Sequence, residues 1–168
     1  EASKEAIKQA FETAKEFIGK LINPALDESG GLVQDTIKFW RFKNKINIIL
    51  KSKKFLENKG INPVKILPKT LVLILENGSL EEDENTQDKW AALLANAADP
   101  EKRYSVKPSF AEILKELSPL EVMLLDRMFD EVNRNKSEKK LEIFFDKEKM
   151  CQNFQIDIDE FDVIADNL

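Results

Sequence analysis

Two groups of charged residues stand in the middle of this 168-residue chain, and their types suit two kinds of chemistry. A basic run without any acidic residue occupies residues 38–54, and its cations are Lys38, Arg41, Lys43, Lys45, Lys51, Lys53 and Lys54. An acidic block follows it, made of Glu76, Glu81, Glu82, Asp83, Glu84 and Asp88. Clustered carboxylates are ligands for hard divalent metal ions, and a basic helix with interleaved aromatic residues is typical of surfaces that bind phosphates or anionic lipids.

The basic run has one functional and two structural interpretations. The functional one is an anionic partner, either nucleic acid or an anionic membrane surface, bound through residues 38–54. In the first structural one, the apolar residues of the run pack in the core and its lysines are solvated. In the second, the acidic block lies against the run. We favour the two structural interpretations together, because exposed lysine faces are common and cost little free energy.

Helix capping explains the acidic block better than metal binding does. Acidic residues are stabilising at a helix N-terminus, where the helix dipole is positive. The block also lacks the glycine-containing loop of an EF-hand. We therefore expect no metal site and no cofactor.

The residues that the chain lacks exclude several enzyme classes. It has no histidine and a single cysteine, Cys151, so Ser-His-Asp catalysis, Cys-His catalysis and His-bearing zinc sites cannot be built within it. We expect Cys151 to be a buried helix residue, and we expect no catalytic residue in this chain. One cysteine and no apolar run of roughly 20 residues favour the reducing cytoplasm as the location.

The apolar spacing predicts an all-α fold, a multi-helix bundle with a long central helix. The expected helices cover residues 3–22, 32–58, 68–75, a segment from Ser79 to Asp99, and 109–117, and a further helix opens after Ser118. The second of these spans roughly 40 Å and is expected to be the central one.

Two helix starts carry the signature of a capping box, a Ser followed three residues later by Glu. At the first, we expect Gly78 to end one helix in the left-handed conformation, and Ser79 to cap the next with Glu82 reaching back. At the second, Ser118 is followed by Pro119, which suits the first helical position, and by Glu121.

Residues 118–168 are expected to form a second domain after a helical bundle domain at residues 1–117. The run Leu141-Glu142-Ile143-Phe144-Phe145 is a candidate strand, Asp146 a cap for a helix through Phe154, and Asp157 with Glu160 a cap for the last helix. This order is that of a winged helix-turn-helix lacking its wing. The apolar spacing continues to the last residue, so we expect the segment to be incomplete there. The last helix is acidic and should be repelled by DNA, which favours a protein-docking or structural role.

Three pieces of the chain, in this order, resemble the abortive infection alpha family: Phe39-Trp40-Arg41-Phe42-Lys43-Asn44, the stretch 79–98, and the stretch 108–121. The resemblance covers roughly residues 5–130 and implies a bacterial phage-defence role in which the infected cell dies or stalls. It transfers no catalytic residue. The motif positions, for most of which we expect structural roles, are Trp40, Arg41, Ser79, Glu82, Trp90, Asn96 and Phe110, with Ser118 and Glu121 added by their capping signature.

These observations predict a non-catalytic interaction or sensor module of a phage-defence protein, acting by binding a protein partner. A long amphipathic helix is also compatible with a homodimer. One alternative is a metal-dependent nuclease or other toxin that uses the carboxylates of residues 81–88. Another is a membrane-surface effector that uses the basic helix.

Overall fold

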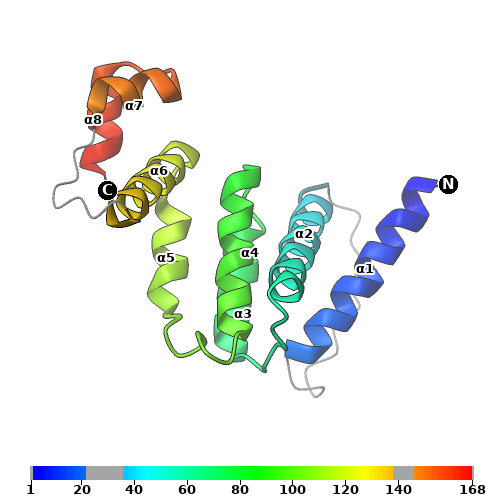
Figure 1. The fold of residues 1–168 in the computed structure, drawn as a ribbon. Helices are drawn as coiled ribbons and strands as arrows, with labels where there is room; N and C mark the ends of the chain where they lie inside the picture. The colour runs from blue at the N-terminus through cyan, green and yellow to red at the C-terminus, as the bar shows by residue number, and fades with distance from the viewer. Residues whose placement is uncertain (1, 22–35, 138–145, 168) are drawn as a thin grey trace. The chain divides into compact units, whose positions relative to one another are not determined.

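The protein is helical wherever the structure describes regular elements. The structure is a computed structural model that describes residues 2–21, 36–137 and 146–167, and the side chains of residues 5–21, 40–134 and 146–167. The helices in these ranges are α1 (Ala2–Leu21), α2 (Thr36–Asn58), α3 (Pro68–Gly78), α4 (Glu84–Ala98), α5 (Pro108–Glu116), α6 (Pro119–Ser137), α7 (Lys147–Phe154) and α8 (Ile158–Asp166) (Figure 1). The predicted all-α fold is confirmed for these ranges. The chain divides into two compact units, Glu1–Glu116 and Leu117–Leu168.

α2 is the central helix of the first unit, as its length predicted. It packs against α1, α3 and α4, and α4 in turn packs against α3 and α5. Figure 1 shows α1, α2, α4 and α5 side by side in that order. Residues 32–35, which were expected to belong to α2, lie outside the described residues. The end of α2 is followed by Gly60, whose φ of 64° is the left-handed conformation that glycine adopts without steric cost.

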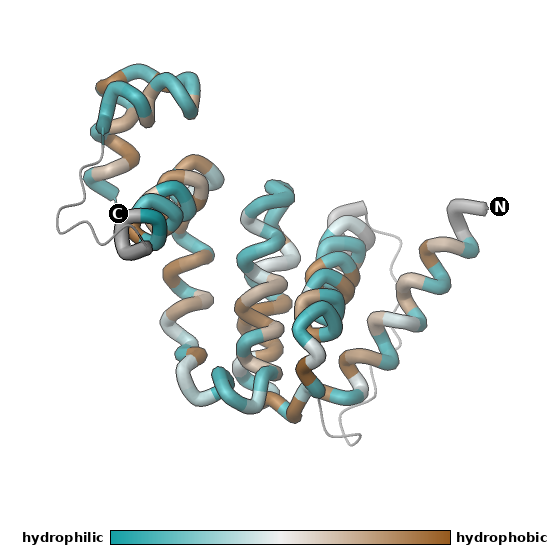
Figure 2. The backbone as a smooth tube through the Cα atoms, viewed as in Figure 1, coloured by the Kyte–Doolittle hydropathy of each residue, from teal (hydrophilic) through white to brown (hydrophobic). Residues whose placement is uncertain are grey.

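One apolar core unites α1 to α5. Its most completely buried large side chains are Leu21, Ile48, Ile74, Trp90 and Leu94. Burying each such side chain contributes about 1.5–3 kcal/mol before the loss of conformational entropy is subtracted. Figure 2 shows hydrophobic and hydrophilic residues alternating along α1, and the buried members of its apolar face recur every three or four residues: Ala14, Phe17 and Leu21.

Gly78 has a packing role rather than the predicted left-handed one. It is the last residue of α3, and Gly60 is the only glycine with positive φ in the described ranges. A Cβ added to Gly78 would lie 2.8 Å from Ile48 Cδ1 and 3.0 Å from Trp90 Cγ. The prediction for Gly78 is therefore wrong: glycine is needed there because α2 and α4 leave no room for a side chain.

The first predicted capping box is also wrong. α4 begins at Glu84, and its N-cap is Asp83, whose carboxylate accepts hydrogen bonds from Thr86 N at 2.7 Å and Thr86 Oγ1 at 2.8 Å. Ser79 is instead the C-cap of α3. Of the acidic residues expected in the first turn of the helix, only Glu84 lies there.

In the second unit, α8 packs against both α6 and α7 around the buried side chains of Leu124, Met150 and Ile164. Every predicted cap that falls in its described part is confirmed. Ser118 N donates to Glu121 Oε2, while Glu121 N donates to Ser118 Oγ at 3.3 Å. The carboxylates of the other two N-caps accept the expected backbone hydrogen bonds: Asp146 from Lys149 N and Asp157 from Glu160 N.

Two other expectations concern the second unit. Cys151 is buried in α7, as predicted. The candidate strand at residues 141–145 lies outside the described residues, so the winged-helix-like arrangement stays a prediction. None of the helices in the described ranges combines the length and the apolar character that a membrane span requires.

Candidate functional site

Arg41 of α2 fastens the end of α3 to the central helix. Its Nε donates to Ser79 Oγ at 3.0 Å, and its Nη2 donates to Glu76 Oε2 at 2.7 Å and to Glu76 O at 3.3 Å. The Ser79 hydroxyl, which is fully buried, donates in turn to Glu76 O at 2.7 Å. Bonds to a charged donor are stronger than neutral ones, so this network holds the start of the α3–α4 loop in one place.

The same loop is held by two carboxamides. Asn44 of α2 is only 4% exposed, and its Nδ2 donates to Ser79 O at 3.1 Å and to Glu81 O at 2.8 Å. Gln87 of α4 is also buried, and its Nε2 donates to Glu81 O at 2.9 Å. Buried polar groups are costly unless they are hydrogen-bonded, and here they satisfy the carbonyl groups of an irregular segment. The loop is therefore anchored from α2 and from α4.

The basic run and the acidic block lie against each other, as the second structural interpretation predicts. Glu76 pairs with Arg41 and with Lys45, whose Nζ lies 2.5 Å from Glu76 Oε1. The hydrogen bond from Lys45, followed by the charges of Lys45 and Arg41, lowers the pKa of Glu76 despite its partial burial. Further along α2, Lys51 Nζ lies 2.7 Å from Asp88 Oδ1 and 3.8 Å from Glu84 Oε1.

The remaining cations of the run differ in their surroundings. Lys53 pairs with Glu57 one turn along α2, at 2.7 Å. Lys43 and Lys54 are exposed, and no ion pair joins either of them to a described residue. The side chain of Lys38 lies outside the described ones. The structure thus spreads the predicted cations over different neighbours rather than gathering them into one cluster.

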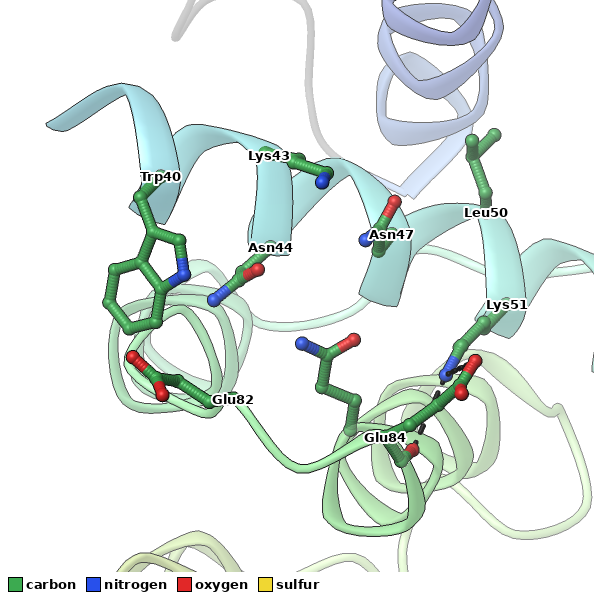
Figure 3. A pocket seen from close by; sticks show the side chains of 9 residues that line it. Trp40, Lys43, Asn44, Asn47, Leu50, Lys51, Glu82 and Glu84 are labelled. Atoms are coloured by element: carbon green, nitrogen blue, oxygen red, sulfur yellow. Dashed lines mark hydrogen bonds and ion pairs between the residues drawn. The ribbon is translucent and has the colours of Figure 1, made fainter. Parts of the chain in front are cut away.

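A polar groove of about 640 Å³ opens between α2 and the segment that leads into α4. Its lining residues are Trp40, Lys43, Asn44, Asn47, Leu50, Lys51, Glu82, Glu84 and Gln87. Figure 3 shows Trp40 and Glu82 at one end of the groove and Lys51 with Glu84 at the other. Lys51 also donates to the backbone oxygen of Glu84 at 3.3 Å, which joins the two walls.

The lining of this groove is of a kind that suits non-covalent binding. An indole, three carboxamides and side chains of both charges face a space of the size that ligand sites have. Two carboxylates of the segment beside it have structural tasks: Asp83 caps α4, with its pKa lowered by the hydrogen bonds from Thr86, and Glu81 accepts a bond from Asp83 N. In the parts of the chain that the structure describes, no group of three or more carboxylate or thiol side chains is placed to hold a metal ion.

Sequence reasoning found the charged walls of this groove and missed its carboxamides. Two of these carboxamides, Asn44 and Asn47, carried one signal that could have revealed them, and Gln87 carried none. Asn44 and Asn47 interrupt the apolar spacing of the central helix on two successive turns, where a purely structural helix would have apolar or charged residues.

Among the other motif positions, Trp90 is in the core with 1% of its surface exposed, and Asn96 is half-buried near the end of α4. Phe110 differs from these because 45% of its surface is exposed on α5.

The comparisons with known proteins give one finding. The family model described as abortive infection alpha matches residues 38–168. No curated protein and no solved structure gives a significant match. The match leaves out α1, which the resemblance had included, and extends through α7 and α8, which the resemblance had left unassigned. The chain therefore belongs to the abortive infection alpha family, which points to a phage-defence context.

Proposed function

We propose that this chain is a non-catalytic interaction module of phage defence, acting in the bacterial cytoplasm, and that it binds a protein partner in the groove between α2 and the start of α4. The observation that carries the proposal is the anchoring of both groove walls. Asn44 and Gln87 hold the loop through Glu81 O, and Lys51 bridges to Glu84 and Asp88. A site that is already ordered loses little conformational freedom when a partner binds.

The pairing of the basic run favours a protein over an anionic polymer or membrane. Arg41, Lys45 and Lys51 form ion pairs with the acidic block, and nucleic acid phosphates would have to compete with those carboxylates. The net charge of −5 adds long-range repulsion of phosphates. A protein partner with mixed charge meets neither obstacle.

Three carboxylates of residues 81–88 have structural uses that speak for binding rather than metal-dependent hydrolysis. Asp83 is the N-cap of α4, and Asp88 is the partner of Lys51. Glu81 accepts the hydrogen bond from the amide of Asp83 at 2.8 Å. Each of these three carboxylates is thus explained by fold stability alone.

The experiment blocks the groove without touching its anchors. Asn47→Arg places a long side chain between the walls, and Asn58→Arg makes the same change at the exposed C-terminal end of α2. Bacteria expressing each protein are challenged with a panel of phages, and plating efficiency is measured beside the thermal unfolding midpoint of the purified proteins.

We expect the wild-type chain and Asn58→Arg to lower the plating efficiency of at least one phage. Asn47→Arg should restore plating to the empty-vector value while unfolding at the wild-type temperature. Full protection by a folded Asn47→Arg protein would refute the groove as the site. A wild-type chain that protects against none of the phages would refute the defence role.

A further inference from the structure

We infer that the groove recognises an extended peptide segment of the partner, anchored by one arginine or lysine side chain that lies on the Trp40 indole and pairs with Glu82. The inference rests on the proposed function and names the chemistry of the partner at the same site.

The Trp40 end of the groove has the two features that a basic side chain requires. Figure 3 shows the indole of Trp40 and the carboxylate of Glu82 at this end, on opposite walls. Glu82 is exposed and Trp40 is half-buried, and neither side chain forms a hydrogen bond or ion pair with a described residue. An aromatic face attracts a cation through its quadrupole, and a carboxylate beside it adds a charge-assisted hydrogen bond.

The middle of the groove suits a peptide backbone. Asn44 and Gln87 use their amide nitrogens to hold the loop, so the carbonyl oxygens of the two carboxamides take no part in those bonds. Asn47 makes no hydrogen bond to any residue in the described ranges. Extended peptides present N–H and C=O groups along their length, and a carboxamide can accept from one and donate to the other.

The length of the groove sets the length of the segment. From Trp40 to Lys51 the α2 wall spans eleven residue steps, or about 16 Å at the helical rise. An extended chain advances about 3.3 Å per residue, so about five residues fit.

The charges along the wall limit the number of basic anchors to one. Lys43, exposed one turn from Trp40, repels any cation nearby, and Glu82 is the one carboxylate of the described residues lining this end that offsets the repulsion for a single basic side chain. At the far end, Glu84 and Asp88 are already paired with Lys51. The groove thus selects a single basic residue in a mixed segment, not a basic tract.

The test is a selection of displayed random heptapeptides on the immobilised full chain. Wild-type protein should enrich peptides with Arg or Lys at one position several-fold over the unselected library. Glu82→Lys should abolish that enrichment and favour Asp or Glu instead. Glu101→Lys, the same change at an exposed loop residue, should leave the basic preference intact.

A selected peptide is then synthesised in two forms, with its basic anchor and with norleucine at that position. Their dissociation constants are compared by isothermal titration calorimetry, which needs no tryptophan reporter and therefore applies equally to variants that lack Trp40. Norleucine should raise the dissociation constant at least tenfold for wild type and leave it nearly unchanged for Trp40→Ala with Glu82→Lys.

Two outcomes would overturn the inference: no enriched basic position on wild-type protein, or the same enrichment on Glu82→Lys. The proposed function fails separately, through phage protection that survives Asn47→Arg. If Asn47→Arg loses protection and the peptide selection enriches no basic position, the peptide inference is wrong and the proposed function still stands.

Discussion

The guanidinium of Arg41 donates a 3.0 Å hydrogen bond from Nε to the hydroxyl of Ser79, a residue 38 positions further along the chain. The Ser79 hydroxyl in turn donates a hydrogen bond to Glu76 O at 2.7 Å. This contact joins the central helix to the end of α3, and it explains why Ser79 is not free to cap α4.

Ser79→Ala should lower the free energy of unfolding by about 1–3 kcal/mol, because it removes a buried hydroxyl and leaves Arg41 Nε without its hydrogen-bond acceptor. Urea unfolding followed by circular dichroism measures the change. Ser105→Ala, at an exposed hydroxyl, is the matched control and should stay within about 0.5 kcal/mol of wild type. Equal stability of the two variants would contradict the role assigned to Ser79.

Gly78→Ala should destabilise the protein by about 1–3 kcal/mol, although alanine is the better helix former. The added Cβ would stand 2.8 Å from Ile48 Cδ1 and 3.0 Å from Trp90 Cγ. Combining it with Ile48→Val, which removes that Cδ1, should recover part of the loss. Thermal unfolding of the single and double variants measures the coupling.

Gly19→Ala is the control for this prediction. Gly19 lies in α1, and nothing is within 4 Å of the Cβ it would gain. We expect a gain of up to about 1 kcal/mol from helix propensity. Equal stabilisation by Gly78→Ala and Gly19→Ala would contradict the close packing of Ile48 and Trp90 against Gly78.

Acid should destabilise the fold through Asp83 and Glu121. Hydrogen bonds from Thr86 lower the pKa of Asp83 from its ordinary value, and those from Ser118 lower the pKa of Glu121 in the same way. A carboxyl whose pKa is lower in the folded state contributes stability that is complete above its unfolded value. That contribution is lost as pH falls through the folded value, because the unfolded chain binds protons first.

Asp83→Asn keeps a capping oxygen but cannot titrate, so its unfolding free energy should depend less on pH than that of wild type as the pH falls below the ordinary pKa of an aspartate. Urea unfolding across this range measures the slope. Asp159→Asn changes an exposed acid that is not a cap, and should leave the wild-type slope intact. An Asp83→Asn slope identical to wild type would mean that the cap does not hold the carboxylate in its charged form.

Charge reversal along α2 should destabilise the fold where the lysine forms an ion pair and have little effect where it forms none with a described residue. Lys51→Glu would face Asp88 and Glu84, and we expect a loss of about 1 kcal/mol. Lys54→Glu, at an exposed position, should change stability by less than about 0.5 kcal/mol.

Thermal unfolding at low and high salt measures the stability of both variants, since screening by salt should reduce the destabilisation caused by Lys51→Glu. Retention on heparin, measured beside it, tests the anionic-partner interpretation. A salt-dependent retention that both variants abolish, without loss of stability, would favour that interpretation over internal pairing.

The caps show where sequence reasoning works. Ser118 and Asp157 were predicted as caps from the residue at the helix start together with a Glu three positions on, and Asp146 from the residue at the helix start. The structure confirms all three. A cap is a bond between residues that are neighbours in the chain. Its signature is therefore complete within a few letters of sequence.

The boundary between α3 and α4 shows where it fails. Ser79 with Glu82 and Asp83 with Thr86 are both acceptable local caps, and only the structure shows that α4 uses Asp83. Arg41 accounts for the difference, because its guanidinium donates a hydrogen bond to the hydroxyl of Ser79, 38 residues further along the chain. Gly78 was misread for the same reason, because Ile48 and Trp90 reach it from two other helices.

The sequence by itself determined the all-α class, most of the helix bounds, three of the caps and the family resemblance, since periodicity, capping and motif order are local properties of the chain. Only the tertiary structure decided the partners of Arg41 and Lys51, the need for glycine at position 78, and the groove that joins Trp40 to Glu82. Each of these depends on the distance between residues that are remote in sequence. Packing of α2 against α3 and α4 sets that distance, and no local pattern records it.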